Sequence, residues 1–173
     1  MCDHIIKEFP KSIAATKCRD LKTTIFEKNI QLSTEQYIPI NRPSRLLIHY
    51  KNHNHLDFYA YHISLGDLQK LGKLYPETKK LDFIEKLKLA KSWDASLKNE
   101  GDFQNHSTEV LLPALENGQY VILATPRGKN NSFAYTNIQV TDLALVETHS
   151  RSHHTFQVID RNNGKPKRDA RIE

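Results

Sequence analysis

The stretch Leu115-Glu-Asn-Gly-Gln-Tyr120 contains the pattern that decides the expected fold. Leu-x-x-Gly-x-Tyr directly before a strand is typical of a tyrosine corner. In that motif the phenol hydroxyl bonds to backbone a few residues upstream and fixes a crossover of a β-sandwich. We therefore assign structural roles to Leu115, Gly118 and Tyr120. The alternative, a chance junction between a loop and a strand, is also structural.

Short apolar runs on both sides of this stretch are typical of further strands. The clearest pair is 45–51 and 56–64, in which apolar and polar residues alternate, joined by the polar turn Asn52-His-Asn-His55. The other runs are 29–35, 93–98, 106–112, 119–125 and 132–141. Polar loops such as 98–105 and 127–131 separate them. The sequence thus predicts a mainly β fold, an Ig-like antiparallel β-sandwich of about seven strands.

The hydrophobic period changes from two to three or four residues in two places. Residues 12–27 predict a short N-terminal helix, with Ser12 as a candidate cap. Residues 66–91 predict two helices inserted between strands, with Asp67 and Thr78 as candidate N-caps.

These assignments divide the 173 residues into three parts. An N-terminal helical segment, 1–28, precedes the sandwich, 29–142, which carries the helical insertion 66–91. Residues 143–173 are expected to be the incomplete start of a following β-sandwich domain. Its strand-like runs are 143–147, 155–160 and 165–173. These are too few to enclose a core, so we expect them to pack on the first sandwich or to self-associate.

The charge and cysteine content exclude several classes of protein. The net charge is +5, but basic and acidic residues are interleaved and only Lys165-Pro-Lys-Arg168 is a tight basic cluster, so no nucleic-acid partner is expected. Cys2 and Cys18 are too few for a disulfide framework, and whether they pair stays open. No apolar run approaches the roughly 20 residues that span a bilayer. The first residues do not form a signal peptide, so a targeting segment would lie outside this chain.

Nine histidines suggest a metal site, but their spacing does not favour one. The pairs closest in sequence are His53 with His55 and His153 with His154. Zinc needs three or four ligands that converge on one point. His49 and His62 lie near His55 only if the strands pair in a register that aligns these three residues. The acids nearby, such as Asp57, lack ligand-like spacing. We therefore expect surface and turn histidines, with no metal and no cofactor.

No catalytic signature is present either. The chain lacks a Gly-x-Ser-x-Gly elbow, a Gly-x-Gly-x-x-Gly motif and a Walker loop, so no catalytic residue is assigned and no enzyme is expected. Trp93 with Tyr59 and Tyr61 can form a platform for sugars, which leaves an alternative function: an Ig-like binding or adhesion module that recognises carbohydrate or protein. Such residues more often pack a core. We place Trp93 in the core as a structural residue, and Tyr59 and Tyr61 beneath the inserted helices.

Four segments resemble the N-terminal macroglobulin domains of large bacterial alpha-2-macroglobulin proteins. The first is Arg42-Pro-Ser-Arg-Leu-Leu-Ile-His-Tyr-Lys-Asn52, which is similar to an early strand of those domains. The run from His106 to Tyr120 resembles a later strand with its tyrosine turn. The run from Phe133 to Leu145 resembles the end of one domain and the start of the next, and 155–173 resembles the beginning of that next domain.

The resemblance implies the role of a non-catalytic scaffold in a row of sandwich modules. Members of the family trap proteases with a bait segment and an internal thioester, whose signature is a Cys-x-Glu-Gln-type motif. Here Cys2 is followed by Asp-His-Ile and Cys18 by Arg-Asp-Leu, so the motif is absent. The family also implies an extracytoplasmic location: periplasmic, cell-surface or secreted. The implied partners are the neighbouring domains of the same full-length chain and a protease target of the parent protein.

Overall fold

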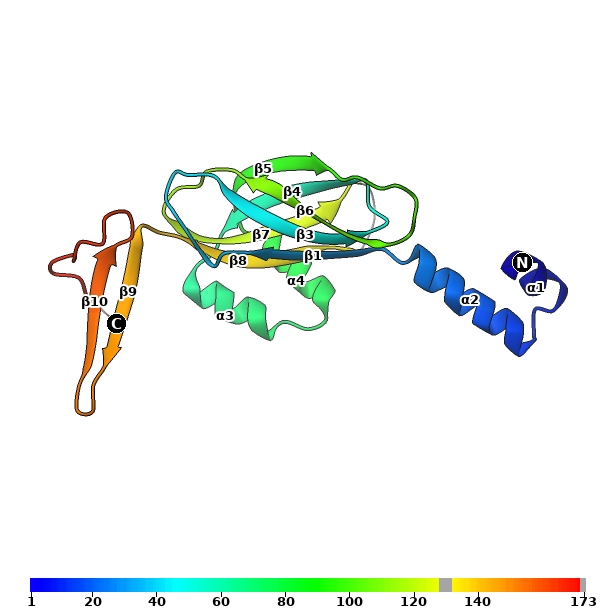
Figure 1. Ribbon diagram of the computed structural model, residues 1–173, viewed down its shortest axis with the longest axis horizontal. Coiled ribbons are helices and arrows are strands. Elements are labelled where there is room, and N and C mark those ends of the chain that lie inside the picture. The colour runs from blue at the N-terminus through cyan, green and yellow to red at the C-terminus, as the bar shows by residue number, and fades with distance from the viewer. Residues whose placement is uncertain (128–131, 172–173) are drawn as a thin grey trace.

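The computed structural model describes residues 1–127 and 132–171. It begins with two helices, α1 (Cys2–Glu8) and α2 (Ile13–Phe26), which project from one end of the molecule (Figure 1). The predicted N-terminal helix is confirmed as α2, and its cap is Ser12, whose Oγ accepts a hydrogen bond of 3.1 Å from the Ala15 amide. The helix α1 was not predicted from the sequence. Both cysteines are free thiols, and a hydrogen bond with Cys2 raises the pKa of the Cys18 thiol.

Two facing sheets form the body of the molecule (Figure 1). The first has the strand order β1 (Asn29–Thr34), β3 (Ser44–Lys51) and β6 (Asn105–Leu112). The second has the order β2 (Tyr37–Ile38), β8 (Ala134–Val140), β7 (Gly118–Pro126), β4 (His55–His62) and β5 (Lys88–Ser96). All pairs are antiparallel except β2 with β8, which is parallel. The expected Ig-like sandwich is confirmed.

The strands of the described sandwich number eight, where the sequence predicts about seven. The additional strand is β2, in which Tyr37 and Ile38 pair with Gln139 and Val140. A run of two residues next to Pro39 is too short to show an alternating pattern, because periodicity needs at least two repeats. Of the predicted loop 127–131, residues 128–131 lie outside the described residues.

The main core fills the space between the two sheets. Its largest fully buried side chains are Tyr120, Phe58, Ile38, Leu46, Ile48, Leu56, Leu112 and Ile122. Successive residues of a strand point to opposite faces, so each sheet contributes every second residue to this core.

Two helices, α3 (Leu65–Lys73) and α4 (Glu77–Ile84), connect β4 to β5 and lie below the five-stranded sheet in Figure 1. They bury a second apolar cluster on its outer face. The buried members are Tyr61, Ile63, Leu71, Ile84, Val121 and Leu123. The helical insertion is thereby confirmed, and Tyr59 and Tyr61 do lie beneath it.

Three details of the insertion differ from the prediction. The N-caps are Ser64 and Pro76, not Asp67 and Thr78. Ser64 takes the role because its Oγ accepts from the Asp67 amide. The helical stretch ends at Ile84, and 88–91 belong to β5, not to a helix ending at Lys91. Because β5 is an exposed edge strand, its first residues show no alternation of apolar and polar side chains.

After the sandwich, β9 (Leu143–His149) and β10 (His154–Asp160) form a separate two-stranded hairpin, which projects from the end opposite to α2 (Figure 1). The predicted runs 143–147 and 155–160 are therefore strands. The third predicted strand, 165–173, is wrong for its described part, since 165–171 form only a single bridge from Pro166 to Ile159. The chain turns between Asp160 and Gly164, where the Gly164 amide donates to the Asp160 carbonyl and Gly164 has a φ of 70°. This turn ends β10 before residue 165. Residues 172–173 lie outside the described residues.

No helix in the described parts of the chain is long and apolar enough to cross a membrane.

Candidate functional site

Tyr120 lies near the start of β7 and is almost fully buried between the sheets. Its hydroxyl donates a hydrogen bond of 3.0 Å to the carbonyl of Glu116, four residues upstream. The ring of His62 covers it at 4.5 Å between centroids. Burial, followed by the charge of Glu116, raises the pKa of the Tyr120 hydroxyl, which therefore stays a donor.

Leu115 and Gly118 flank this bond. Leu115 is buried, and its carbonyl accepts from the Asn41 amide at 2.9 Å, which ties the turn to the β2–β3 loop. Gly118 has a φ of 157°, and a Cβ there would lie 3.4 Å from Cε2 of Tyr120. We propose that the three residues act together as the corner of the sandwich.

The aromatic residues considered for a sugar platform lie on opposite faces of the five-stranded sheet. Trp93 faces the main core and stacks on Phe58 at 5.5 Å between centroids, with 12° between the ring planes. Tyr59 and Tyr61 stack on each other at 6.2 Å, on the face that α3 and α4 cover. A single flat platform cannot form from residues that the sheet separates.

The histidines of the sandwich have separate partners. His49 Nδ1 is 2.7 Å from Ser107 Oγ, whereas His62 packs on the Tyr120 ring. His55 Nε2 lies 3.2 Å from Asp94 and 3.4 Å from Asp57, and Arg127 pairs with Asp57 at 3.1 Å. The register of the strands does not bring His49, His55 and His62 together.

His53 differs from these because it is buried in the β3–β4 turn. Its Nε2, like that of His55, has no hydrogen-bond partner. Burial, together with the nearby charge of Lys28, lowers its pKa below the ordinary 6.5. The ring is therefore neutral at pH 7, as a buried imidazole without an acceptor must be.

A network of hydrogen bonds joins the hairpin to the sandwich around Asp142. The Asp142 carboxylate accepts from the Ile40 amide at 3.0 Å, and its carbonyl accepts from the Arg161 amide at 2.7 Å. Arg161 Nη1 also donates to the Thr141 carbonyl at 3.3 Å, and Thr141 Oγ1 accepts from the Leu143 amide. The base of the hairpin is thus fixed, while its length projects outward.

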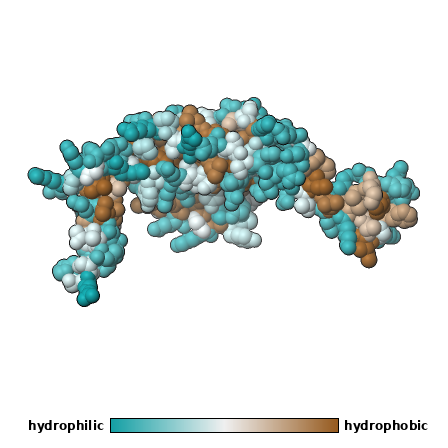
Figure 2. All heavy atoms as spheres, in the orientation of Figure 1, coloured by the Kyte–Doolittle hydropathy of each residue, from teal (hydrophilic) through white to brown (hydrophobic). Residues whose placement is uncertain are grey.

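A cleft of about 510 Å³ lies at this junction. It is lined by Tyr37, Gln139, Thr141, Leu143, Ala144, Leu145, Val158 and Arg161. Leu143, Leu145 and Phe156 lie on one face of the hairpin and are 48%, 55% and 46% exposed. Figure 2 shows a hydrophobic patch on the part of the hairpin nearest the sandwich, whereas the tip is hydrophilic. A two-stranded hairpin with an uncovered apolar face is marginal in water, so this face is suited to be covered by further structure.

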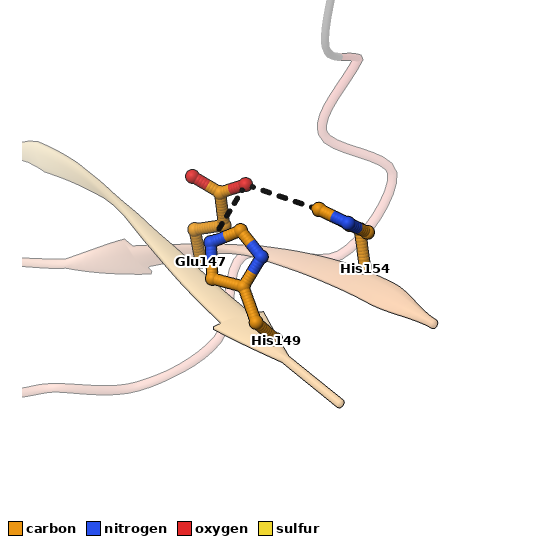
Figure 3. A group of neighbouring side chains, drawn as sticks. All are labelled: Glu147, His149 and His154. Carbon is orange, nitrogen blue, oxygen red and sulfur yellow. Dashed lines mark ion pairs between the residues drawn. The ribbon is translucent and has the colours of Figure 1, made fainter. Parts of the chain in front are cut away.

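The tip of the same hairpin brings together three polar side chains, Glu147, His149 and His154 (Figure 3). Of the two histidine pairs singled out in the sequence, 53/55 and 153/154, neither converges. His153 instead contacts Ser152 Oγ through Nδ1 at 2.7 Å. The alternation in Glu147-Thr-His149 places two of these side chains on one face of a strand. The spacing between histidines alone does not reveal this arrangement.

A scan against models of protein families found no match, and a search of curated proteins found none either. Among solved structures, native alpha-2-macroglobulin from Escherichia coli, spanning domains MG0-NIE-MG1, matches with a TM-score of 0.57 at 14% identity. The match covers 82% of this chain and 48% of that one, so the chain spans about half the length of that structure.

Two other matches are weaker. Salmonella alpha-2-macroglobulin reacted with methylamine has a TM-score of 0.36 at 12% identity, covering 79% of this chain and 11% of that one. Red sea bream transglutaminase has a TM-score of 0.38 at 13% identity, covering 87% and 23%. Scores this low bear neither on fold nor on function. The E. coli match shows the fold alone, and the chain accordingly has an alpha-2-macroglobulin-like β-sandwich fold.

Proposed function

We propose that this chain is a non-catalytic structural module of a longer, extracytoplasmic protein built like the alpha-2-macroglobulins. Its role is to hold neighbouring domains in a fixed relation. The sandwich supplies a rigid body, and the hairpin β9–β10 is the first part of a following domain. Protease trapping belongs, in this proposal, to the parent protein and not to this module.

The observation that carries the proposal is the hairpin. Its base is fixed to the sandwich through Asp142 and Arg161, whereas its apolar face, with Leu143, Leu145 and Phe156, is open. Anchored strands with an uncovered apolar face are what the first two strands of an adjoining sandwich would look like without the remaining strands.

The match to the E. coli protein supports the same proposal. Residues 29–142 make up about two thirds of the chain, and the match covers 82% of the chain. That structure spans three named domains, MG0, NIE and MG1, so domains follow one another in that protein.

The test compares this chain with one extended by the residues that follow it in its gene. The double variant Leu145→Ser/Phe156→Ser is made in both, with Val146→Ser, on the other face of the hairpin, as control. In the present chain we expect little change in the melting temperature of the sandwich, because Leu145 and Phe156 lie on the hairpin and are about half exposed. In the extended chain we expect the double variant to lower the melting temperature and the control to have a smaller effect.

Equal melting temperatures for the extended chain and its double variant would contradict the proposal. A dimer of the extended chain that dissociates in the double variant would also contradict it, since the apolar face would then serve self-association even with the following residues present.

A further inference from the structure

We propose that Glu147, His149 and His154 form a binding site for a single borderline divalent cation of the zinc class at the tip of the β9–β10 hairpin. The three residues lie on the same face of the hairpin as Leu145 and Phe156, and ion binding does not require a following domain. The types of the three ligands, the register of the two strands and the distances between the ligand atoms support this site.

The register of the hairpin places the three side chains together. His149 and His154 are directly opposed across the two strands, and Glu147 lies two residues before His149 on the same face. Opposed residues in an antiparallel pair have Cβ atoms about 4.5–5.5 Å apart, which is within reach of one shared ion. Figure 3 shows the two imidazoles converging on the carboxylate.

The distances between ligand atoms fit a small tetrahedral ion. Glu147 Oε1 lies 3.3 Å from His149 Nε2 and 3.5 Å from His154 Nδ1. Zinc bonds of 2.0–2.2 Å to nitrogen and oxygen, arranged tetrahedrally, separate neighbouring ligand atoms by about 3.3–3.6 Å. All three ligand atoms lie within 4.8 Å of one another. A small rotation of the imidazole rings therefore brings the two histidine nitrogens to the separation that zinc requires.

The turn beyond the ligands holds them in place. The Ser150 amide donates to the His153 carbonyl at 2.9 Å, and the His153 amide donates to Ser150 Oγ at 3.1 Å. These bonds close the hairpin directly after His149 and before His154. A short closed turn fixes the strand register, and with it the order of the ligands before any ion binds.

The ligand set selects the class of ion. Two imidazoles and one carboxylate are suited to zinc, copper and nickel. Magnesium and calcium prefer sites made of oxygen ligands alone. The side chains of His149, His154 and Glu147 are 60%, 63% and 42% exposed, which leaves the fourth position open to water or to a group from a neighbouring molecule. Three protein ligands with one open position are also the arrangement of many zinc sites in enzymes.

The test is calorimetric titration of the tag-free chain with Zn²⁺, repeated with Co²⁺ to read coordination from its visible absorption. We expect one saturable site, unaffected by millimolar Mg²⁺. His149→Ala, His154→Ala and Glu147→Gln should each weaken binding by at least roughly tenfold, because even partners outside the ligand shell are worth about 10–100-fold. The matched control is His153→Ala, which removes the neighbouring histidine engaged by Ser152.

A second readout is amide hydrogen exchange in β9 and β10. At a free zinc concentration of a hundred times Kd, exchange through opening of the hairpin should slow about a hundredfold, and this slowing should be lost in His154→Ala. The proposal is overturned if no saturable binding occurs up to 1 mM, or if His153→Ala weakens binding as much as His154→Ala does. Binding without slowed exchange in the hairpin would also overturn it.

Discussion

At the scale of single residues, we propose that the hydroxyl of Tyr120 stabilises the corner of the sandwich. It is buried and has one partner, the Glu116 carbonyl. Removing the hydroxyl by Tyr120→Phe leaves that carbonyl without its donor, which costs on the order of 1–3 kcal/mol of unfolding free energy. Urea unfolding monitored by circular dichroism measures this loss.

The control for that variant is Tyr75→Phe, because Tyr75 is 85% exposed. The control should unfold at the same urea concentration as the parent chain. An unchanged midpoint for Tyr120→Phe would show that the tyrosine corner does not stabilise this sandwich.

His53 makes stability depend on pH. Its pKa in the folded chain is lowered by burial, so below about pH 6.5 the unfolded chain binds a proton that the folded chain does not. The contribution is fully present above the unfolded pKa and is lost as pH falls towards the folded pKa. We therefore expect the unfolding free energy to decrease from pH 7 to pH 5.

The variant His53→Leu separates this residue from the others that titrate. The pKa values of Asp67, Asp102 and Asp160 are lowered by their partners, so these carboxylates lose their contributions only below about pH 4. The slope of unfolding free energy between pH 7 and pH 5 should be smaller in His53→Leu, whatever its absolute stability. An identical slope would show that His53 is not the group responsible.

At the scale of elements, α3 and α4 stabilise the chain by covering the outer face of the five-stranded sheet. Leu71 is 1% exposed and packs in that cluster, whereas Leu65 on the same helix is 67% exposed. Leu71→Ala should cost about 2–5 kcal/mol, and Leu65→Ala less than about 0.5 kcal/mol. Chemical unfolding of the two variants decides this, and equal effects would mean that the helices do not shield the sheet.

The elements that sequence patterns predicted have regularly spaced or continuous apolar residues. In β3 every second residue is buried, whereas β4 and β7 are buried on both faces because α3 and α4 cover the outer one. The helix α2 buries only Ala15 and was predicted from its apolar spacing and its Ser12 cap. The edge strand β5 was predicted to start at Trp93 because its first five residues are exposed. The strand β2 was missed because it has two residues, and α1 because none of its residues is buried. A hydrophobic pattern reveals an element only where its apolar side chains are buried at regular spacing. The elements β2 and α1 and the first residues of β5 bury few side chains.

At the scale of the whole molecule, we expect that the chain forms no covalent bond with a protease. Neither Cys2 nor Cys18 lies in a thioester motif. Incubation with an active protease should give no covalent complex on a denaturing gel. A complex that resists denaturation and disappears in a Cys2→Ser/Cys18→Ser variant would contradict the absence of a trapping group.

The candidate sites differ in how far sequence could predict them. The tyrosine corner is a local motif, since Leu115, Gly118 and Tyr120 lie within six residues. The junction at Asp142 joins Ile40 to a residue 102 positions away, which no local pattern reveals. The cluster of Glu147, His149 and His154 depends on the hairpin register, and therefore on the turn between the strands.

In the proposed function, the β9–β10 hairpin is the beginning of a following domain. The most direct measurement is amide hydrogen exchange, in the absence of zinc, on this chain and on one extended by the residues that follow in its gene. In the present chain the amides of β9 and β10 should exchange far faster than those of β4 and β7, because few side chains cover them. In the extended chain they should become as protected as the sandwich. Unchanged fast exchange in the extended chain would contradict the claim, as would full protection of the hairpin in the present chain at low concentration.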